Sequence, residues 1–181
     1  MVNPNKLKLT QLQQNILNTL FVKVGNYQSQ RDLSKILNVS PPAIKKALPR
    51  LIEEEFINME FDKSKRTNIS LNFENPSVIN LKRIFNINSI YSSGLFKFLE
   101  QNLPGATIIL FGSYSKGEDT LKSDIDIAII GRKEKEIILE KYEKILEREI
   151  ILQFYDSSQK IHKSLRENIF NGIVYSGGIE L

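Results

Sequence analysis

The sequence predicts an α+β protein with two parts. Three helices and a β-hairpin come first, and a small domain around a mixed sheet follows. Apolar residues recur at helical spacing through most of residues 10–55, and they alternate with polar residues through residues 57–73. Farther along, the apolar runs 108–111 and 125–130 are typical of strands and enclose a polar segment. Apolar residues make up 41% of the 181 residues, which is enough for packed cores.

Composition excludes several kinds of site. The chain has no cysteine, which excludes disulfides, thiol catalysis and cysteine-ligated zinc, and its single histidine, His162, excludes most histidine metal sites. No apolar run approaches the length of a membrane span, and the first residues lack the apolar core of a signal peptide. We therefore expect a cytoplasmic protein with no membrane partner.

Charge is distributed unevenly along the chain. Residues 1–80 contain 11 Lys and Arg against 7 Asp and Glu, whereas residues 81–181 contain 14 of each, so the whole net charge of +4 lies in the first part. Because the excess of positive charge is confined to one part of the chain, we expect a single surface there that binds an anionic partner.

The first two helices follow from caps and periodicity. Thr10 suits the N-cap of a helix that ends at residues 25–26, where Gly and Asn stop it. A second, shorter helix is expected over residues 29–37, with Leu33 and Ile36 facing inward.

The third helix is expected over residues 41–55. Ser40 suits its N-cap and Pro41 its first position, where a missing N–H costs nothing. Pro49 lies inside the helix and should kink it, because it removes a backbone hydrogen bond at a cost of about 3 kcal/mol. The expected inner face carries Ile44, Ala47, Leu48, Leu51 and Ile52.

Residues 57–61 and 67–73 alternate like paired strands around the polar turn 62–66. Three helices followed by such a hairpin resemble the winged helix-turn-helix proteins. The likeness lies in residues 33–44 and 48–57 and implies a first domain over residues 1–76.

The winged-helix resemblance implies that the start of the third helix enters the major groove of double-stranded DNA and that the hairpin loop contacts its backbone. The candidate DNA-binding residues are Ser40, Pro42, Ala43, Lys45, Lys46 and Arg50 in the helix, and Lys63, Lys65 and Arg66 in the loop. Winged helices also serve as protein-protein modules, and the basic helix residues would then form a solvated face.

Residues 77–102 are expected to form a helical linker that is broken near residues 86–88. Its apolar residues fit either a core or the seam of a homodimer. Beyond the 125–130 strand, we expect an amphipathic helix over residues 133–147, another over 157–171, and a short strand near 173–175.

The segment between the two strands carries the chemistry. Asp124 and Asp126 share one face of their strand, because successive side chains point to opposite faces. Two carboxylates at such a short distance raise each other's pKa unless a cation neutralises them. Oxygen ligands of this kind suit Mg²⁺ that is held jointly with phosphates. Gly112 allows a close backbone approach, and the Ser113 hydroxyl and nearby amides can donate to phosphate oxygens.

Gly112-Ser113 followed by Ser123-Asp124-Ile125-Asp126 resembles the minimal nucleotidyltransferases of the DNA polymerase beta superfamily, which occur mainly in archaea and bacteria. The likeness extends from about Phe96 to the end and implies a transferase domain over residues 103–181. It implies that the Gly-Ser pair holds an NTP, that the two aspartates hold Mg²⁺, and that a third carboxylate comes from a later strand. The nucleotide-binding candidates are Gly112, Ser113, Lys116 and Ser123.

The third carboxylate is the departure from that pattern. Aligned with the family, its place falls on Ile151, in an expected strand over residues 149–155 whose core face carries Ile150, Leu152 and Phe154. Glu149 has the right parity but lies two residues away, roughly 6 to 7 Å along a strand. The catalytic candidates are therefore Asp124, Asp126 and Glu149.

Two functions fit these residues. The first is a DNA-binding protein whose second domain binds Mg-NTP and transfers an NMP to a protein or RNA hydroxyl, as antitoxin-like or regulatory members of the family do. The second is a transcriptional regulator whose transferase domain is catalytically degenerate and serves as a nucleotide sensor or docking module.

Overall fold

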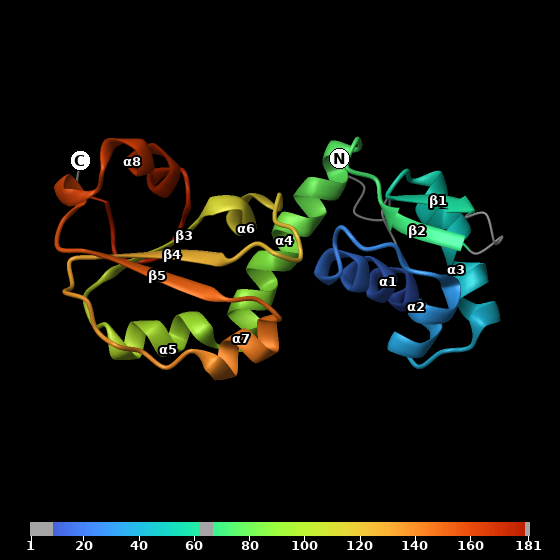
Figure 1. Ribbon diagram of the computed structural model, residues 1–181, viewed down its shortest axis with the longest axis horizontal. Coiled ribbons are helices and arrows are strands. Elements are labelled where there is room, and N and C mark those ends of the chain that lie inside the picture. Colours follow the sequence, from blue (N-terminus) through green and yellow to red (C-terminus); the bar gives the residue numbers. More distant parts are fainter. Residues whose placement is uncertain (1–8, 62–66, 180–181) are drawn as a thin grey trace, which may run out of the picture. The chain divides into compact units, whose positions relative to one another are not determined.

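A computed structural model describes residues 9–61 and 67–179, and the chain divides into two compact units between Val78 and Ile79 (Figure 1). The first unit contains α1 (Gln11–Val22), α2 (Gln30–Ile36), α3 (Pro41–Glu53), β1 (Ile57–Phe61) and β2 (Thr67–Leu71). The strands pair antiparallel, and Gln28 adds a bridge to Ile69. The predicted order of three helices and a hairpin is confirmed.

Side-chain caps start the first two helices. The Thr10 side chain accepts a hydrogen bond from the backbone N–H of Gln13, and the Gln13 side chain accepts one from the backbone N–H of Thr10. Ser29 and Asp32 form the same reciprocal capping box at the start of α2. α3 runs through Pro49 as one helix, so the expected kink does not interrupt it.

The core of this unit lies between its helices and the hairpin. Two residues expected to face inward do not, because Ile36 is 50% exposed and Ile52 is 38% exposed. Both lie at the edge of the apolar stripe of their helix, where periodicity separates inside from outside least sharply. The fully buried residues of the unit are Ile16, Leu33, Ile44, Leu51 and Ile69.

The second unit is built on a four-stranded mixed sheet with the order β5-β4-β3-β6, in which only β4 and β5 pair in parallel. Its strands are β3 (Thr107–Phe111), β4 (Ile125–Ile130), β5 (Ile150–Tyr155) and β6 (Ile173–Ser176). Its helices are α4 (Pro76–Ser93), which begins before the boundary, α5 (Leu95–Asn102), α6 (Gly112–Lys116), α7 (Glu140–Leu146), the 3-10 turn η1 (Ser158–Lys160) and α8 (Lys163–Phe170).

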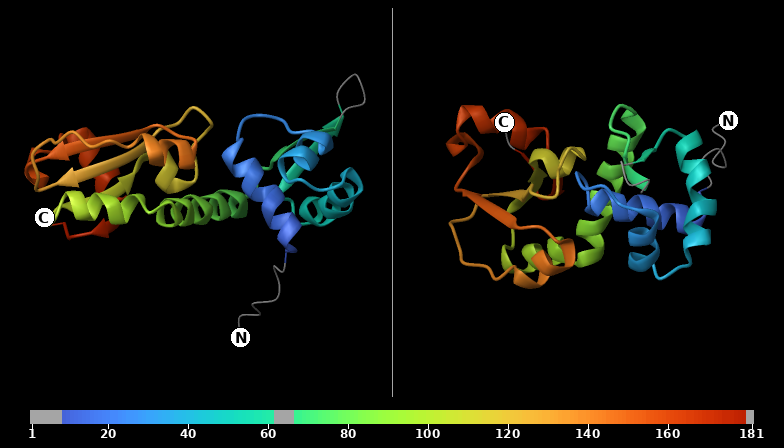
Figure 2. Two further views of the ribbon diagram at one scale, coloured as in Figure 1. Left: turned by 90° about the horizontal axis from the view of Figure 1, so that it is seen from below. Right: turned by 45° about the vertical axis from the view of Figure 1, so that its right-hand side comes forward.

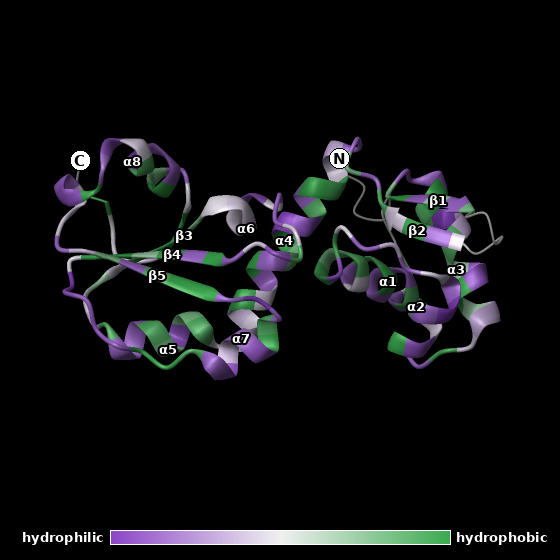
Figure 3. Cartoon of the chain, viewed as in Figure 1, coloured by the Kyte–Doolittle hydropathy of each residue, from purple (hydrophilic) through white to green (hydrophobic). Residues whose placement is uncertain are grey.

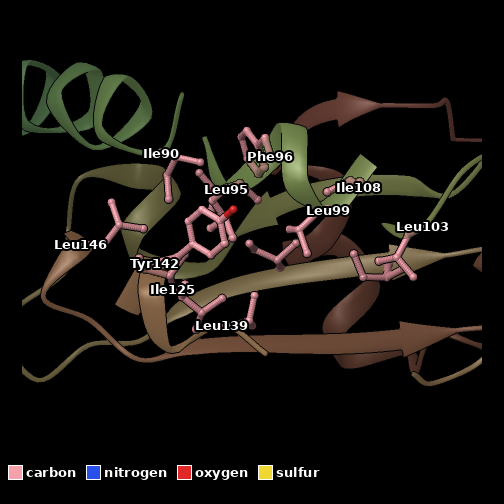
Figure 4. Packing of buried hydrophobic residues seen from close by; sticks show 14 of the residues in the cluster. Ile90, Leu95, Phe96, Leu99, Leu103, Ile108, Ile125, Leu139, Tyr142 and Leu146 are labelled. Atoms are coloured by element: carbon pink, nitrogen blue, oxygen red, sulfur yellow. The ribbon is translucent and has the colours of Figure 1, made fainter. Parts of the chain in front are cut away.

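Helices cover both faces of the sheet. Figures 1 and 2 show α5 and α7 on one face and α8 on the other. The larger core joins α4, α5 and α7 to Ile108 and Ile125 of the sheet (Figure 4), and the smaller core joins Ile109 and Phe111 to Ile169 of α8. Strands β3 and β5 are mostly hydrophobic, whereas the helices carry both hydrophobic and hydrophilic residues (Figure 3). Ile150, Leu152 and Phe154 contact the larger core, as their alternation predicts.

Three helix boundaries differ from the prediction. α4 continues through residues 86–88 and ends at Ser93, just before Gly94, whose φ of 78° is left-handed. The expected helix over 133–147 is reduced to α7, and the expected helix over 157–171 is divided into η1 and α8. The segment 77–102 supplies Ile90, Leu95, Phe96 and Leu99 to the core of the second unit. None of the helices in the described part of the chain is long and apolar enough to span a membrane.

Candidate functional site

The ends of three strands meet at one edge of the sheet of the second unit. Phe111, the last residue of β3, is paired with Asp126 of β4, and Asp126 is paired on its other side with Ile151 of β5. Gly112 follows Phe111 directly and Asp124 precedes β4, so the topology brings the Gly-Ser pair and the Asp-x-Asp pair to the same edge.

Gly112 and Asp126 lie in direct contact. Gly112 has a φ of 72°, which residues other than glycine rarely adopt. A Cβ added there would collide with the Asp126 carboxylate. The glycine is therefore required twice, once for its backbone conformation and once for the space that the carboxylate occupies. The sequence separates these two residues by a loop, and the fold joins them.

The two aspartates differ in exposure and interact electrostatically. Asp124 is exposed and Asp126 is half-buried. Burial, and then the negative charge of Asp124, raise the pKa of Asp126. Two carboxylates that repel each other beside a glycine turn are a suitable donor pair for one Mg²⁺ that also holds phosphate oxygens. Within residues 9–61 and 67–179, no group of three or more Asp, Glu, His or Cys side chains could hold a metal.

The titration of Asp126 should show this coupling. We expect its carboxyl to titrate above the ordinary 3.8 in the metal-free wild type, and at lower pH in Asp124→Asn, because that variant removes the repulsive charge. NMR titration of the side-chain carbon checks this. Asp156 is an internal standard, since its hydrogen bond from Lys160 lowers its pKa. An Asp126 midpoint that is equal in both proteins would contradict the coupling.

The other nucleotide-binding candidates lie around the same turn. Ser113 is half-buried at the start of α6, and Lys116 is exposed at its end. The Ser123 hydroxyl accepts from the Thr120 amide at 2.9 Å. That hydrogen bond gives Ser123 a role in shaping the turn that leads to Asp124.

The strand register shows where the residue expected at the place of the third carboxylate lies. Ile151 lies beside Asp126 on the neighbouring strand, and strands lie about 4.8 Å apart. Glu149 lies two residues earlier, where its carbonyl accepts from the Ile125 amide at 2.8 Å and its side chain is exposed. An apolar residue therefore stands next to Asp126, and the nearest acidic residue on that strand is beside Asp124.

Sequence reasoning did not find a buried polar cluster next to this edge. Lys82 and Asn86 of α4 both bind Asp119, the latter at 2.7 Å, and Arg148 lies 3.6 Å from the same carboxylate. All four side chains are buried. Helical spacing could have indicated this cluster. Lys82 and Asn86 lie on the same face of α4 as the buried residues Val78 and Ile90, each four residues from the next.

The DNA-binding candidates of α3 are only partly free to contact a ligand. Lys45 and Lys46 are exposed on the first half of the helix, next to exposed Ser40 and Pro42 and half-buried Ala43. Arg50 is engaged within its own helix, in ion pairs with Glu53 at 2.8 Å and with Glu54. Lys63, Lys65 and Arg66 lie outside the described residues.

Comparisons with known proteins support both parts. A model of the winged helix-turn-helix DNA-binding family matches residues 9–58, and a model of the nucleotidyltransferase domain family matches residues 92–176. A comparison with curated proteins found no match.

Similar solved structures include a mutant of ZitR from Lactococcus lactis, MepR, a transcription regulator of the Staphylococcus aureus multidrug efflux pump MepA, and the adhesin competence repressor AdcR from Streptococcus pyogenes. Their identities are 20%, 26% and 23%, with TM-scores of 0.41, 0.41 and 0.43. The matches cover 55%, 52% and 55% of this chain, and 66%, 66% and 69% of those chains. This chain thus spans just under two thirds of the first two, and TM-scores this low carry no argument about function.

The family matches contain the residues singled out at each site. Asp124, Asp126 and Gly112 fall within 92–176, and Lys45 and Lys46 fall within 9–58. The chain therefore joins a winged helix-turn-helix domain to a nucleotidyltransferase domain.

Proposed function

We propose that this protein binds double-stranded DNA through its first unit, and that its second unit binds a nucleoside triphosphate with Mg²⁺ and transfers an NMP to a hydroxyl of a protein or RNA. The observation that carries the proposal is the contact between Gly112 and the Asp126 carboxylate. This contact supports the proposal because it joins the expected phosphate-binding turn to a carboxylate of the expected metal site. A protein that uses NTP and DNA in this way belongs in the cytoplasm.

Each residue of the edge has a role in this proposal. Gly112 lets the phosphates approach the backbone, and the Ser113 hydroxyl donates to them. Asp124 and Asp126 would hold Mg²⁺, which when bound supplies charge neutralisation for the triphosphate. Lys116, exposed at the end of α6, adds a positive charge near the phosphates.

Titration of ATP, GTP, CTP and UTP by calorimetry, with and without Mg²⁺, tests the nucleotide site. Binding that requires Mg²⁺ is expected for at least one of them, because the aspartate pair repels a triphosphate until a cation neutralises it. Binding is measured before transfer because it does not depend on the identity of the acceptor. Failure of all four nucleotides to bind would overturn the proposal.

A second candidate function is favoured by Ile151 beside Asp126. Without a carboxylate there, the acceptor hydroxyl lacks part of its activation, and the second unit would act as a nucleotide sensor or docking module of a DNA-binding regulator. The two candidates differ in one result. Mg-dependent binding that never leads to release of pyrophosphate with any acceptor supports the sensor.

DNA binding should depend on Lys45 and Lys46, which are exposed at the start of α3. We expect Lys45→Ala with Lys46→Ala to weaken binding and to reduce the slope of log K against log salt by about 2, one for each lost phosphate contact. Fluorescence anisotropy over a salt series measures both. The matched control is Lys97→Ala with Lys141→Ala, two exposed lysines of the second unit. An equal loss in the control would assign the effect to overall charge.

We also propose that the protein forms a homodimer through the helices of residues 78–102. α4 leaves Ile84 63% exposed and Tyr91 52% exposed, which are large apolar residues seven positions apart on one face. A monomeric mass in sedimentation equilibrium at micromolar concentration would contradict this.

A further inference from the structure

The proposed chemistry does not use the buried polar cluster around Asp119. Its members come from three places, Lys82 and Asn86 from α4, Asp119 from the loop after α6, and Arg148 from the residues before β5. The Lys82 side chain is fully buried and the Asp119 side chain nearly so. Lys82 and Asn86 precede residues 92–176, so the nucleotidyltransferase family model does not include them.

Asp119 is the centre of the cluster. Its Oδ1 accepts from both Lys82 Nζ and Asn86 Nδ2, and its Oδ2 faces Arg148 at 3.6 Å. One carboxylate is thereby held between two cations. A buried charge is costly unless it is paired and hydrogen-bonded, so these partners fix the position of the loop at Asp119.

α4 holds the neighbouring α6 at two more points. Asn86 Nδ2 donates to the carbonyl of Tyr114 at 2.9 Å. Gly117, the C-cap of α6, has a φ of 78° and packs so closely on α4 that a Cβ there would collide with the backbone of Ile79 and Arg83. The close packing and the hydrogen bond place α6 directly on the helix that carries Lys82.

The segment that is held in this way is the one that carries the site. It begins at Gly112, passes through α6, and ends at Asp124. Between Gly117 and Asp124 the loop has its own turn bonds, such as the Ser123 amide to the Thr120 carbonyl at 3.1 Å. These short-range bonds shape the loop but do not attach it to the rest of the unit, whereas Asp119 does.

We propose that Lys82, Asn86, Asp119 and Arg148 are positioning residues of the nucleotide site, and that they fix residues 112–124 so that the Gly112-Ser113 turn and Asp124 face the same phosphates. The proposal rests on the proposed nucleotide binding. None of the four acts on the substrate, because all four side chains are buried. Their effect reaches the ligand through the backbone that they hold.

Lys82→Met is the first test, because methionine fills the space of the lysine stem and removes the ammonium group, with its charge and its hydrogen bond to Asp119. The expected result is Mg-NTP affinity weaker by about 10- to 100-fold, the usual cost of losing a partner that orients a binding group. Hydrogen exchange is also expected to accelerate at the amides of residues 113–124, while the amides of β3 and β4 stay protected. Asp119→Asn, which keeps the side-chain size, is the second variant in case Lys82→Met does not fold.

Leu103→Ala is the matched control for general destabilisation. Leu103 belongs to the larger core and precedes β3, at the opposite end of that strand from Gly112. A structural role alone predicts that both variants speed exchange throughout the unit and keep the affinity of the folded protein. That result, or unchanged affinity in Lys82→Met, would overturn the inference. If the wild type binds no nucleotide, the proposed function fails, but hydrogen exchange still tests whether the cluster holds residues 112–124. Faster exchange confined to these residues supports that role of the cluster, and a uniform change throughout the unit overturns it.

Discussion

Replacing both candidate metal ligands, by Asp124→Asn with Asp126→Asn, is expected to abolish Mg²⁺-dependent nucleotide binding. The loss should exceed the roughly 10- to 100-fold cost of removing an outer partner, because these side chains would contact the metal directly. Asparagine keeps the shape of each side chain, so the contact of residue 126 with Gly112 is preserved. Calorimetric titration with the best-binding NTP measures the effect.

The same variant should not lose folding stability. Asp126 has a raised pKa in the folded state, so its charged form is disfavoured there, and its contribution to stability is present at low pH and lost as pH rises through the folded pKa. A neutral asparagine avoids this loss at pH 7. We expect a thermal unfolding temperature equal to or above that of the wild type, which separates loss of ligands from loss of fold.

Asp156→Asn is the matched control for removing a carboxylate from this unit. Asp156 follows the end of β5, whereas Asp126 lies near the start of the parallel β4, so the two are at opposite ends of the sheet. Asp156 pairs with Lys160 at 2.7 Å on the surface. The control should bind Mg-NTP as the wild type does. Retained Mg²⁺-dependent binding in the Asp124 and Asp126 double variant would remove the basis for the metal site.

Ile151→Asp is expected to strengthen Mg²⁺-dependent binding by on the order of tenfold, because affinity of such sites increases with the number of charged ligands. Ile151 is half-buried on β5 and paired with Asp126 on the adjacent strand β4. A carboxylate at position 151 would therefore reach the Mg²⁺ held by Asp126. If the protein is a transferase limited by this position, the rate of pyrophosphate release with a competent acceptor should increase as well.

The gain at position 151 should carry a cost when metal is withheld. A third carboxylate beside Asp124 and Asp126 adds repulsion, so the thermal unfolding temperature of Ile151→Asp should fall without Mg²⁺ and recover when it is added. Ile151→Asn is the control, since it has the same size and polarity without the charge. Equal Mg²⁺ affinities in the two variants would show that position 151 does not face the metal.

Local patterns were sufficient for most of the fold. An apolar run predicted the 125–130 strand with the bounds that β4 has, and helical spacing predicted the three helices of the first unit, because each pattern follows from what a single element buries. The parity of Ile150, Leu152 and Phe154 was also right, and it placed Ile151 correctly on the face away from the larger core.

Local patterns failed where a polar residue is used by a distant part of the chain. The Asn-rich residues 86–88 suggested a helix break, yet Asn86 lies inside α4 because its amide group binds Asp119 and the Tyr114 carbonyl. Residues 133–139 were expected to be helical, but Leu139 is buried in the larger core and Ile137 packs against it, while Ile138 between them is 76% exposed. This alternation is not that of a helical face.

The sequence by itself determined the two families, the Gly-Ser and Asp-x-Asp pairs, and the apolar residue at position 151, where the family resemblance implies a carboxylate. Each of these is recognised from residues close together along the chain. Only the tertiary structure decided that Gly112 touches Asp126, that Ile151 lies beside Asp126, and that Lys82 holds Asp119. These contacts join residues separated by 14 to 37 positions. Strand pairing and the pairing of buried charge create them, and neither leaves a repeating pattern in the sequence.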